Sequence, residues 1–365
     1  MEDLQDNDRA RREGERRRPR PASHRFSVAP MLDYTDRHFR VLMRQITTCS
    51  LLYTEMVVAQ ALHHARRQPG AERPGGHLER LLGFDPCERP LALQVGGDDP
   101  ELLADAARLA ADWGYDAINL NVGCPSEKVQ KGRFGACLMA EPDQVARCVA
   151  AMAAASPLPV TVKHRIGIDE RDSYAELLAF VDTVAGAGCQ RFAVHARKAW
   201  LEGLDPKQNR TIPPLRHDLV HRLKADRPQL TIELNGGLQT LEDCLAQLER
   251  VDGVMVGRAV YDHPLRWAAV DRLIHGSSAA PEGESHLAMA ARVVRGLKPY
   301  AEGWLARGER LWPIARHLVK LVEGVPGARR WRQQLTCSAG DRQADVQVLE
   351  QAALLLERGQ PSAPP

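Results

Sequence analysis

Residues 118–139 have the sequence INLNVGCPSEKVQKGRFGACLM. Apolar side chains alternate with polar or small ones from Ile118 to Val122, which predicts a β-strand. Pro125 has no N–H to donate to a sheet, so we expect the strand to end at Cys124. The loop beyond it is rich in lysine, arginine and glycine, and is expected to be basic and conformationally loose. A thiol at a strand end in such surroundings is a candidate for chemistry, but a small buried hydrophobic residue explains this stretch alone equally well.

The composition predicts a globular protein. The chain has 365 residues, of which 44% are hydrophobic, enough for one large domain or two. No apolar run approaches the roughly 20 residues of a membrane span, and no secretory signal peptide is recognisable. The eight cysteines are scattered without a CxxC pair, which argues against a disulfide framework or a zinc site. We therefore expect a cytoplasmic protein with no membrane partner and no metal.

The net charge of +2 hides two basic segments on an otherwise acidic chain. Residues 9–20 contain seven arginines and two glutamates, and residues 287–340 contain ten lysines and arginines against three acidic residues. Such segments indicate a polyanionic partner. For the first segment, a solvated disordered arm is the stronger interpretation.

Strand-like and helix-like patterns alternate along most of the chain. The helix-like patterns include residues 101–113, 142–155, 173–187 and 240–248, with Thr240 and Asp243 as a helix-start cap and Gly114 and Gly188 as helix-end glycines. The strand-like runs are residues 25–32, 51–59, 90–96, 116–124, 158–166, 191–198, 230–237 and 251–258. Eight such strands predict an α/β fold, a (β/α)8 TIM barrel. An open doubly wound sheet is the competitor, but it usually has fewer strands, and its glycine fingerprint is absent after the first strand.

The same patterns predict the domain bounds. We expect a disordered Arg-rich leader over residues 1–23, the barrel over 24–276 and a linker over 277–285. A small all-helical C-terminal domain over 286–358, which carries the second basic segment, and a disordered tail over 359–365 complete the chain.

Barrel enzymes place their active sites at the carboxyl ends of the strands, and this chain has reactive residue types there. Lys163 could stabilise a developing negative charge or form a Schiff base, and Gln94 could both donate to and accept from the pyrimidine edge of a flavin. His195 has a second interpretation as a satisfied core histidine. Glu55, at the end of the second strand, is either a structural carboxylate or a substrate contact.

The loops after the last two strands predict a phosphate site. Gly236 and Gly237 allow close approach of the backbone, and Arg258 adds a fixed charge that can bond in bidentate fashion. Ordinary turn glycines are the alternative. Ser-His-Asp, HExxH and Walker patterns are missing from the sequence.

Seven segments together resemble the tRNA-dihydrouridine synthases. They are APMLDYTD, LALQVGG, NLNVGCPSEKVQKGRFGACLM, VTVKHRIGID, FAVHARKAWLEGLDPKQNRTIPPL, ELNGG and DGVMVGR, in an order that spans about residues 25–335. The segment HARKAWLEGLDPKQNR followed by IPPL resembles the A-type subfamily, which reduces uridines 20 and 20a in the tRNA D-loop.

The resemblance implies an FMN-dependent enzyme that uses NADPH as reductant and binds tRNA. We expect the protein to be a monomer. It implies that Cys124 is the proton donor and that Asn121, Lys207, Arg210, Arg329 and Arg332 contact tRNA. The residues implied to hold FMN are Pro30, Met31, Leu32, Gln94, Lys163, His195, Asn235, Gly236, Gly237, Gly257 and Arg258.

The chemistry of uracil accounts for these roles. The C5=C6 bond is conjugated to the C4 carbonyl, so hydride from flavin N5 can add at C6 and charge collects on C5 and O4. A free cysteine thiol, with a pKa of about 8.5, is still protonated at neutral pH, so Cys124 is expected to protonate C5 as an acid. Two other functions remain open: an FMN barrel that acts on a free pyrimidine, and an RNA-binding module without activity. The basic helical domain argues against the first, and the intact set of site residues against the second.

Overall fold

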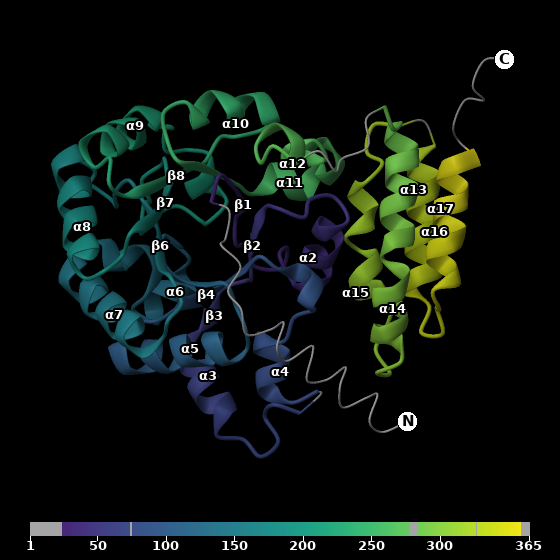
Figure 1. Cartoon of the computed structure of the whole chain (residues 1–365), viewed down its shortest axis with the longest axis horizontal. Coiled ribbons are helices and arrows are strands. Elements are labelled where there is room, and N and C mark those ends of the chain that lie inside the picture. The colour runs from purple at the N-terminus through teal and green to yellow at the C-terminus, as the bar shows by residue number, and fades with distance from the viewer. Residues whose placement is uncertain (1–23, 74, 278–282, 326, 359–365) are drawn as a thin grey trace. The chain divides into compact units, whose positions relative to one another are not determined.

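The computed structural model describes residues 24–73, 75–277, 283–325 and 327–358 (Figure 1). The expected leader and tail, and most of the expected linker, lie outside these ranges. The backbone falls into two compact units. Of the described residues, one unit contains 24–33 together with 50–257, and the other contains 34–49 together with those of 258–358.

The first unit is a closed parallel barrel, as the sequence predicted. Within the described residues the strand order is β2-β1-β9-β8-β7-β6-β5-β4-β3, and an additional pairing of β2 with β4 closes the ring. Both β2 and β3 pair with β4, so they are successive segments of one barrel strand, and the barrel has eight strands. The strands are β1 (Phe26–Val28), β2 (Leu51–Tyr53), β3 (Val57–Val58), β4 (Leu91–Gly96), β5 (Ala117–Val122), β6 (Val160–Arg165), β7 (Arg191–His195), β8 (Thr231–Asn235) and β9 (Gly253–Val256).

Helices surround this ring; Figure 1 shows α7, α8, α9 and α10 outside the strands. Helix α5 packs against α7, and α7 against α8. The helices of this unit are α3 (Ala59–Arg66), α4 (His77–Leu82), η1 (Pro86–Glu88), α5 (Pro100–Asp112), α6 (Glu127–Lys131), η2 (Gly135–Ala140), α7 (Pro142–Ala155), α8 (Tyr174–Gly186), η3 (Gln208–Arg210), α9 (His217–Asp226) and α10 (Leu241–Leu248).

Local signals set the helix ends, as expected. Thr240 forms a capping box with Asp243 at the start of α10, and Ser173 forms one at the start of α8. Gly114 and Gly188 follow α5 and α8 with φ of +82° and +107°, a conformation that residues with a Cβ avoid. These caps satisfy backbone groups that the helix itself cannot pair.

Strand register decides which side chains enter the barrel. The interior packs a cluster of buried residues, most of them small: Ala29, Leu51, Tyr53, Ala92, Ala117, Ala193 and Met255. Side chains alternate across a strand, so the residues two or four positions further toward the carboxyl end also point inward. Lys163, for example, pairs with Asn121 on one side and Ala193 on the other. One end of the barrel therefore collects polar side chains from several strands.

The second unit is helical, as predicted for the C-terminal part of the chain. It also includes the short segment 34–49, because the side chain of Asp36 bonds Arg316 and His317, and that of Asp271 bonds Thr47. Its elements are α2 (Arg37–Arg44), α11 (Arg258–Asp262), η4 (Pro264–Trp267), α12 (Val270–Leu273), α13 (His286–Gly296), α14 (Lys298–Leu305), α15 (Trp312–Ala315), η5 (Leu318–Lys320), α16 (Ala328–Gly340) and α17 (Gln347–Arg358). The domain bounds expected from the sequence stay a prediction. In the described part of the chain, no helix combines the length and the apolar character needed to cross a membrane.

Candidate active site

Cys124 lies just beyond the carboxyl end of β5, and a neighbouring side chain fixes its backbone. The Oδ1 atom of Asn121 accepts hydrogen bonds from the backbone N–H of Gly123 at 3.1 Å and of Cys124 at 3.0 Å. Strand β5 consequently ends at Val122, two residues before the end we predicted from Pro125. The half-buried thiol donates to the hydroxyl of Ser126, with 3.6 Å between Sγ and Oγ.

The segment after Cys124 forms the short helices α6 and η2 where a loop was expected. Ser126 caps helix α6 by accepting the N–H of Val129 at 3.4 Å. The buried ring of Phe134 lies against Gly96 and Gly132. A Cβ on Gly96 would lie 2.7 Å from Cε2 of Phe134, and one on Gly132 would be closer still to the same ring. The glycines therefore make room for an aromatic anchor in place of a flexible hinge.

A ladder of amides crosses the barrel below Cys124. Asn121 donates to Oε1 of Gln94 at 2.9 Å, and Nε2 of Gln94 donates to Oδ1 of Asn119 at 2.8 Å. Asn119 in turn donates to the hydroxyl of Thr161 at 2.8 Å. Gln94 is only 1% exposed, and its amide keeps one N–H and one lone pair for a further partner. Asn121, predicted to contact tRNA, is thus also the residue that positions Cys124.

The mouth of the barrel is electropositive. Burial, and next the charge of Arg165, lowers the pKa of Lys163 from 10.5 to about 8. Burial, followed by the charges of Arg165 and Lys163, brings the pKa of His195 well below its usual range, so its imidazole is neutral at physiological pH. The charges of Arg197 and Arg210 act in the same direction on His195. Such a site favours an anionic ligand.

Three glycines line the site where backbone must approach closely. Gly236 and Gly237 have φ of +108° and +80°. A Cβ on Gly236 would lie 2.6 Å from Cδ2 of His195. A Cβ on Gly257 would lie 3.3 Å from Sδ of Met31, one of the residues expected to bind FMN. Next to these glycines, the side chain of Asn235 donates to the carbonyl of Met255 at 2.7 Å.

The segment after β1 gives Glu55 a structural role. Pro30 and Met31 are half-buried, and Leu32 is 67% exposed. Asp33 follows with φ of +67°, and its N–H donates to Oε1 of Glu55 at 2.5 Å. This bond supports an uncommon backbone conformation at Asp33. It agrees with the first of the two interpretations of Glu55, a structural carboxylate.

Lys207 and Arg210 are exposed on a turn that is built by its own side chains. Asp205 accepts the N–H groups of Lys207 and Gln208 at 2.6 and 2.7 Å. The buried amide of Asn209 bonds the backbone of Trp200 through both Oδ1 and Nδ2. The charge of Arg210 also lowers the pKa of Lys163, so this turn lies within electrostatic reach of the mouth.

Arg165, the last residue of β6, is a site residue to which the sequence motifs assign no role. It is 3% exposed and donates hydrogen bonds to backbone carbonyls of two different segments beside Cys124 and Lys207. An arginine two positions after an inward-facing lysine was the available signal. Arg258, by contrast, is exposed at the start of α11, which belongs to the second unit. Its expected phosphate contact stays a prediction.

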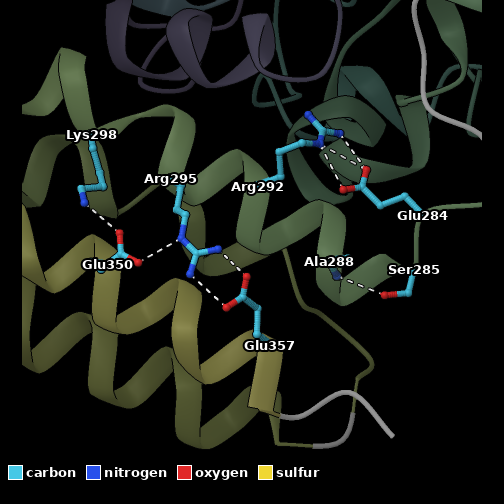
Figure 2. Close-up of polar contacts among 8 residues, drawn as sticks. All are labelled: Glu284, Ser285, Ala288, Arg292, Arg295, Lys298, Glu350 and Glu357. Carbon is cyan, nitrogen blue, oxygen red and sulfur yellow. Dashed lines mark hydrogen bonds and ion pairs between the residues drawn. The ribbon is translucent and has the colours of Figure 1, made fainter. Parts of the chain in front are cut away.

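In the helical unit, ion pairs neutralise one group of basic residues. Figure 2 shows three cations of α13 and of the start of α14 bound to carboxylates. Arg295 pairs with Glu350 at 3.0 Å and also with Glu357, and Lys298 pairs with Glu350 at 2.7 Å. Arg292 similarly pairs with Glu284 at 3.0 Å. The pairs of Arg295 join α13 to α17, and that of Lys298 joins α14 to α17. Each of these cations is thus balanced by a carboxylate.

Helix α16 carries the cations that the sequence singled out. Its buried residues are Ala328, Trp331, Leu335 and Ala339. Arg329 and Arg332 are three residues apart and therefore lie on one flank of the helix, the first exposed and the second half-buried. Among the residues that the structure describes, neither has an acidic partner.

A parallel barrel with ionisable side chains gathered at the carboxyl ends of its strands is the architecture of a (β/α)8-barrel enzyme. The family model described as Dihydrouridine synthase (Dus) matches residues 27–357, so the chain belongs to the dihydrouridine synthase family. This confirms the family that the sequence motifs indicated.

Curated relatives match over nearly the whole chain. A protein of Synechocystis sp. is 55% identical over 328 residues, which cover 90% of this chain and 93% of the relative. A protein of Pseudomonas aeruginosa is 50% identical over 338 residues, or 93% and 97% of the two chains. One of Escherichia coli K12 is 50% identical over 335 residues, or 92% of each chain. All three relatives are named tRNA-dihydrouridine(20/20a) synthase.

Proposed function

We propose that this chain reduces uridines 20 and 20a in the tRNA D-loop to dihydrouridine, with FMN as cofactor and NADPH as reductant, as a cytoplasmic monomer. The observation that carries the proposal is the position of Cys124. A thiol held at a strand end shares an electropositive barrel mouth with Lys163 and a neutral His195. The names of the relatives support the choice of substrate.

The residues at the mouth fit an anionic flavin. Lys163 has a lowered pKa chiefly because burial disfavours its charge, and a bound anion would compensate that charge. Gly236, Gly237 and Gly257 lack the Cβ atoms that would fill the space beside His195, Leu215 and Met31. The proposed FMN contacts are Pro30, Met31, Leu32, Gln94, Lys163, His195, Asn235, Gly236, Gly237, Gly257 and Arg258. When bound, the flavin would supply the hydride that adds at C6 of uracil.

The chain's own residues complete the reduction by moving a proton. Cys124 would deliver its Sγ proton to C5, on the face of the base opposite the hydride. Asn121 fixes the backbone of Cys124, and the hydroxyl of Ser126 orients the thiol. The thiolate that remains would be stabilised by the positive charges of Lys163 and Arg165, both of which interact electrostatically with Cys124. Fixed cations that stabilise charge in this way need no reorganisation during the reaction.

Binding of tRNA requires cations outside the barrel as well. The uridine must leave the base stack to enter the mouth, at a cost of a few kcal/mol that is least in a loop. Lys207 and Arg210 are exposed close to the mouth and are proposed to contact the nucleotide. Arg329 and Arg332 on α16 are proposed to bind phosphates, because they have no acidic partner among the described residues.

Two measurements test the proposal. Dihydrouridine mapped position by position in tRNA from cells that lack the gene should be lost at 20 and 20a alone. Loss at other positions would contradict the assigned positions but keep the chemistry. The purified protein should be yellow and should oxidise NADPH in the presence of tRNA that lacks dihydrouridine. Oxidation of NADPH with free uracil or orotate but not with tRNA would favour a free-pyrimidine enzyme.

A further inference from the structure

Arg165 connects two segments that are far apart in the sequence. Its Nε donates to the carbonyl of Gly123 at 2.9 Å, directly before Cys124. Its Nη1 donates to the carbonyls of Lys198 and Asn209, both at 3.0 Å. One guanidinium therefore binds the strand end that carries Cys124 and both ends of the segment that leads to Lys207 and Arg210.

The charge of Arg165 has no carboxylate beside it among the residues that the structure describes. The side chain is nevertheless 3% exposed, and burial lowers its pKa to about 10. A buried charge without a counter-ion is costly, and here three carbonyl dipoles compensate for it. The planar guanidinium holds its N–H groups in fixed directions toward the three carbonyls, whereas the three N–H groups of a lysine share one rotatable nitrogen.

Gln130 provides a second connection between the same two segments. From helix α6, its Nε2 donates to the carbonyl of Pro125 at 2.9 Å and to that of Leu201 at 2.8 Å. The far segment is itself rigid, because Asn209 bonds the backbone of Trp200 and Leu204. Two independent bridges across the same gap indicate that the relative position of the two segments matters.

We propose that Arg165 is a positioning residue that holds Cys124 and the Lys207–Arg210 turn in one fixed arrangement. The inference rests on the proposed function, in which Cys124 is the acid and the turn contacts the nucleotide. A base held by the turn would then meet the thiol at the distance that the guanidinium sets. A misplacement of about 1 Å in such a geometry can cost on the order of 100-fold in rate.

The test separates the two halves of the reaction. In the proposed function, Cys124 and the turn act on the nucleotide, so reoxidation of the reduced enzyme by tRNA depends on both and flavin reduction by NADPH on neither. Stopped-flow absorbance would follow each half for the flavin-loaded wild type, Arg165→Met and Arg165→Lys. We expect flavin content and NADPH reduction within about twofold of wild type, and reoxidation by tRNA slower by 10- to 100-fold in both variants.

A readout without cofactor or tRNA is hydrogen exchange of the backbone. In Arg165→Met and in Gln130→Leu, peptides that cover 123–130 and 198–211 should exchange faster together, while the rest of the barrel keeps its protection. The matched control is Arg191→Lys, at a half-buried arginine that is the first residue of β7 and pairs with Glu233. That variant should leave both half-reactions and both peptides unchanged.

The outcomes distinguish this inference from the proposed function. If the wild type is not reoxidised by tRNA, the proposed function fails and the inference fails with it. If the wild type is reoxidised and the Arg165 variants match it, Arg165 does not position the site. If flavin content and both half-reactions fall together, Arg165 is a general stabilising residue and the inference is overturned.

Discussion

The buried charge of Lys163 should make the flavin-free wild type less stable than a variant with an uncharged side chain at this position. Its pKa falls from the 10.5 of a free lysine to about 8, because the barrel interior disfavours the charged form. At about 1.4 kcal/mol per pH unit, this difference corresponds to about 3 kcal/mol of destabilisation. Lys163→Met removes the charge and keeps an apolar chain of similar length. At pH 7 we therefore expect the free energy of unfolding to rise by up to about 3 kcal/mol.

The pH dependence gives this prediction its sign. Between pH 8 and 10.5 the unfolded wild type binds more protons than the folded protein at this position, so wild-type stability rises with pH through that range. The excess free energy of unfolding of Lys163→Met over the wild type should therefore be largest below pH 8 and disappear above pH 10.5. Urea unfolding of both flavin-free proteins at several pH values measures it, with the exposed Lys128→Met as control. The reasoning is refuted if Lys163→Met is no more stable than the wild type at pH 7. It is also refuted if the difference in stability does not decrease between pH 8 and 10.5.

Three further predictions concern the thiol, the glycine turn and the helical unit. Cys124→Ala should still bind flavin and tRNA, but its rate of dihydrouridine formation should fall by about 100-fold or more, as expected for loss of a general acid. Normal turnover would exclude the acid role. Gly236→Ala places a Cβ 2.6 Å from His195 at a φ of +108°, so the purified protein should carry less FMN per chain; normal flavin content would contradict the cradle. Replacement of Arg329 and Arg332 by alanine should weaken tRNA binding and reduce the slope of log Kd against log salt by about 2. Arg295→Ala, which removes a cation already paired with Glu350 and Glu357, should leave that slope unchanged, and equal effects would mean that the contacts are misplaced.

The alternation of side chains was sufficient to predict the barrel. A strand repeats every two residues and a helix every 3.6, so the two leave distinct local patterns in the sequence. Eight strands and their order along the chain could therefore be derived from neighbouring residues. The same holds for Thr240 with Asp243, since a capping box spans only four positions. The same pattern predicted that Cys124 lies beyond a strand end, and therefore at the mouth of the barrel.

Strand ends and breaks were predicted less well, because side chains from elsewhere set them. The end of β5 is decided by the amide of Asn121, which takes the two N–H groups that a longer strand would have used. The second barrel strand is interrupted at residues 54–56, where the hydroxyl of Thr54 accepts the N–H of Gln94 from the adjacent strand. Neither bond leaves a periodic signal in the sequence.

The sequence by itself determined the fold class, the family motifs and the chemical identity of the groups at the barrel mouth. Only the tertiary structure decided how those groups are held. It joined Arg165 to carbonyls 33 to 44 positions away in the chain, and it paired Arg295 with carboxylates of α17 while Arg329 remained exposed on α16. The physical reason is that hydrogen bonds and ion pairs depend on distance and direction in space, which local composition does not encode. Charge counts therefore indicated a polyanion partner, but the fold determined which charges are available to bind it.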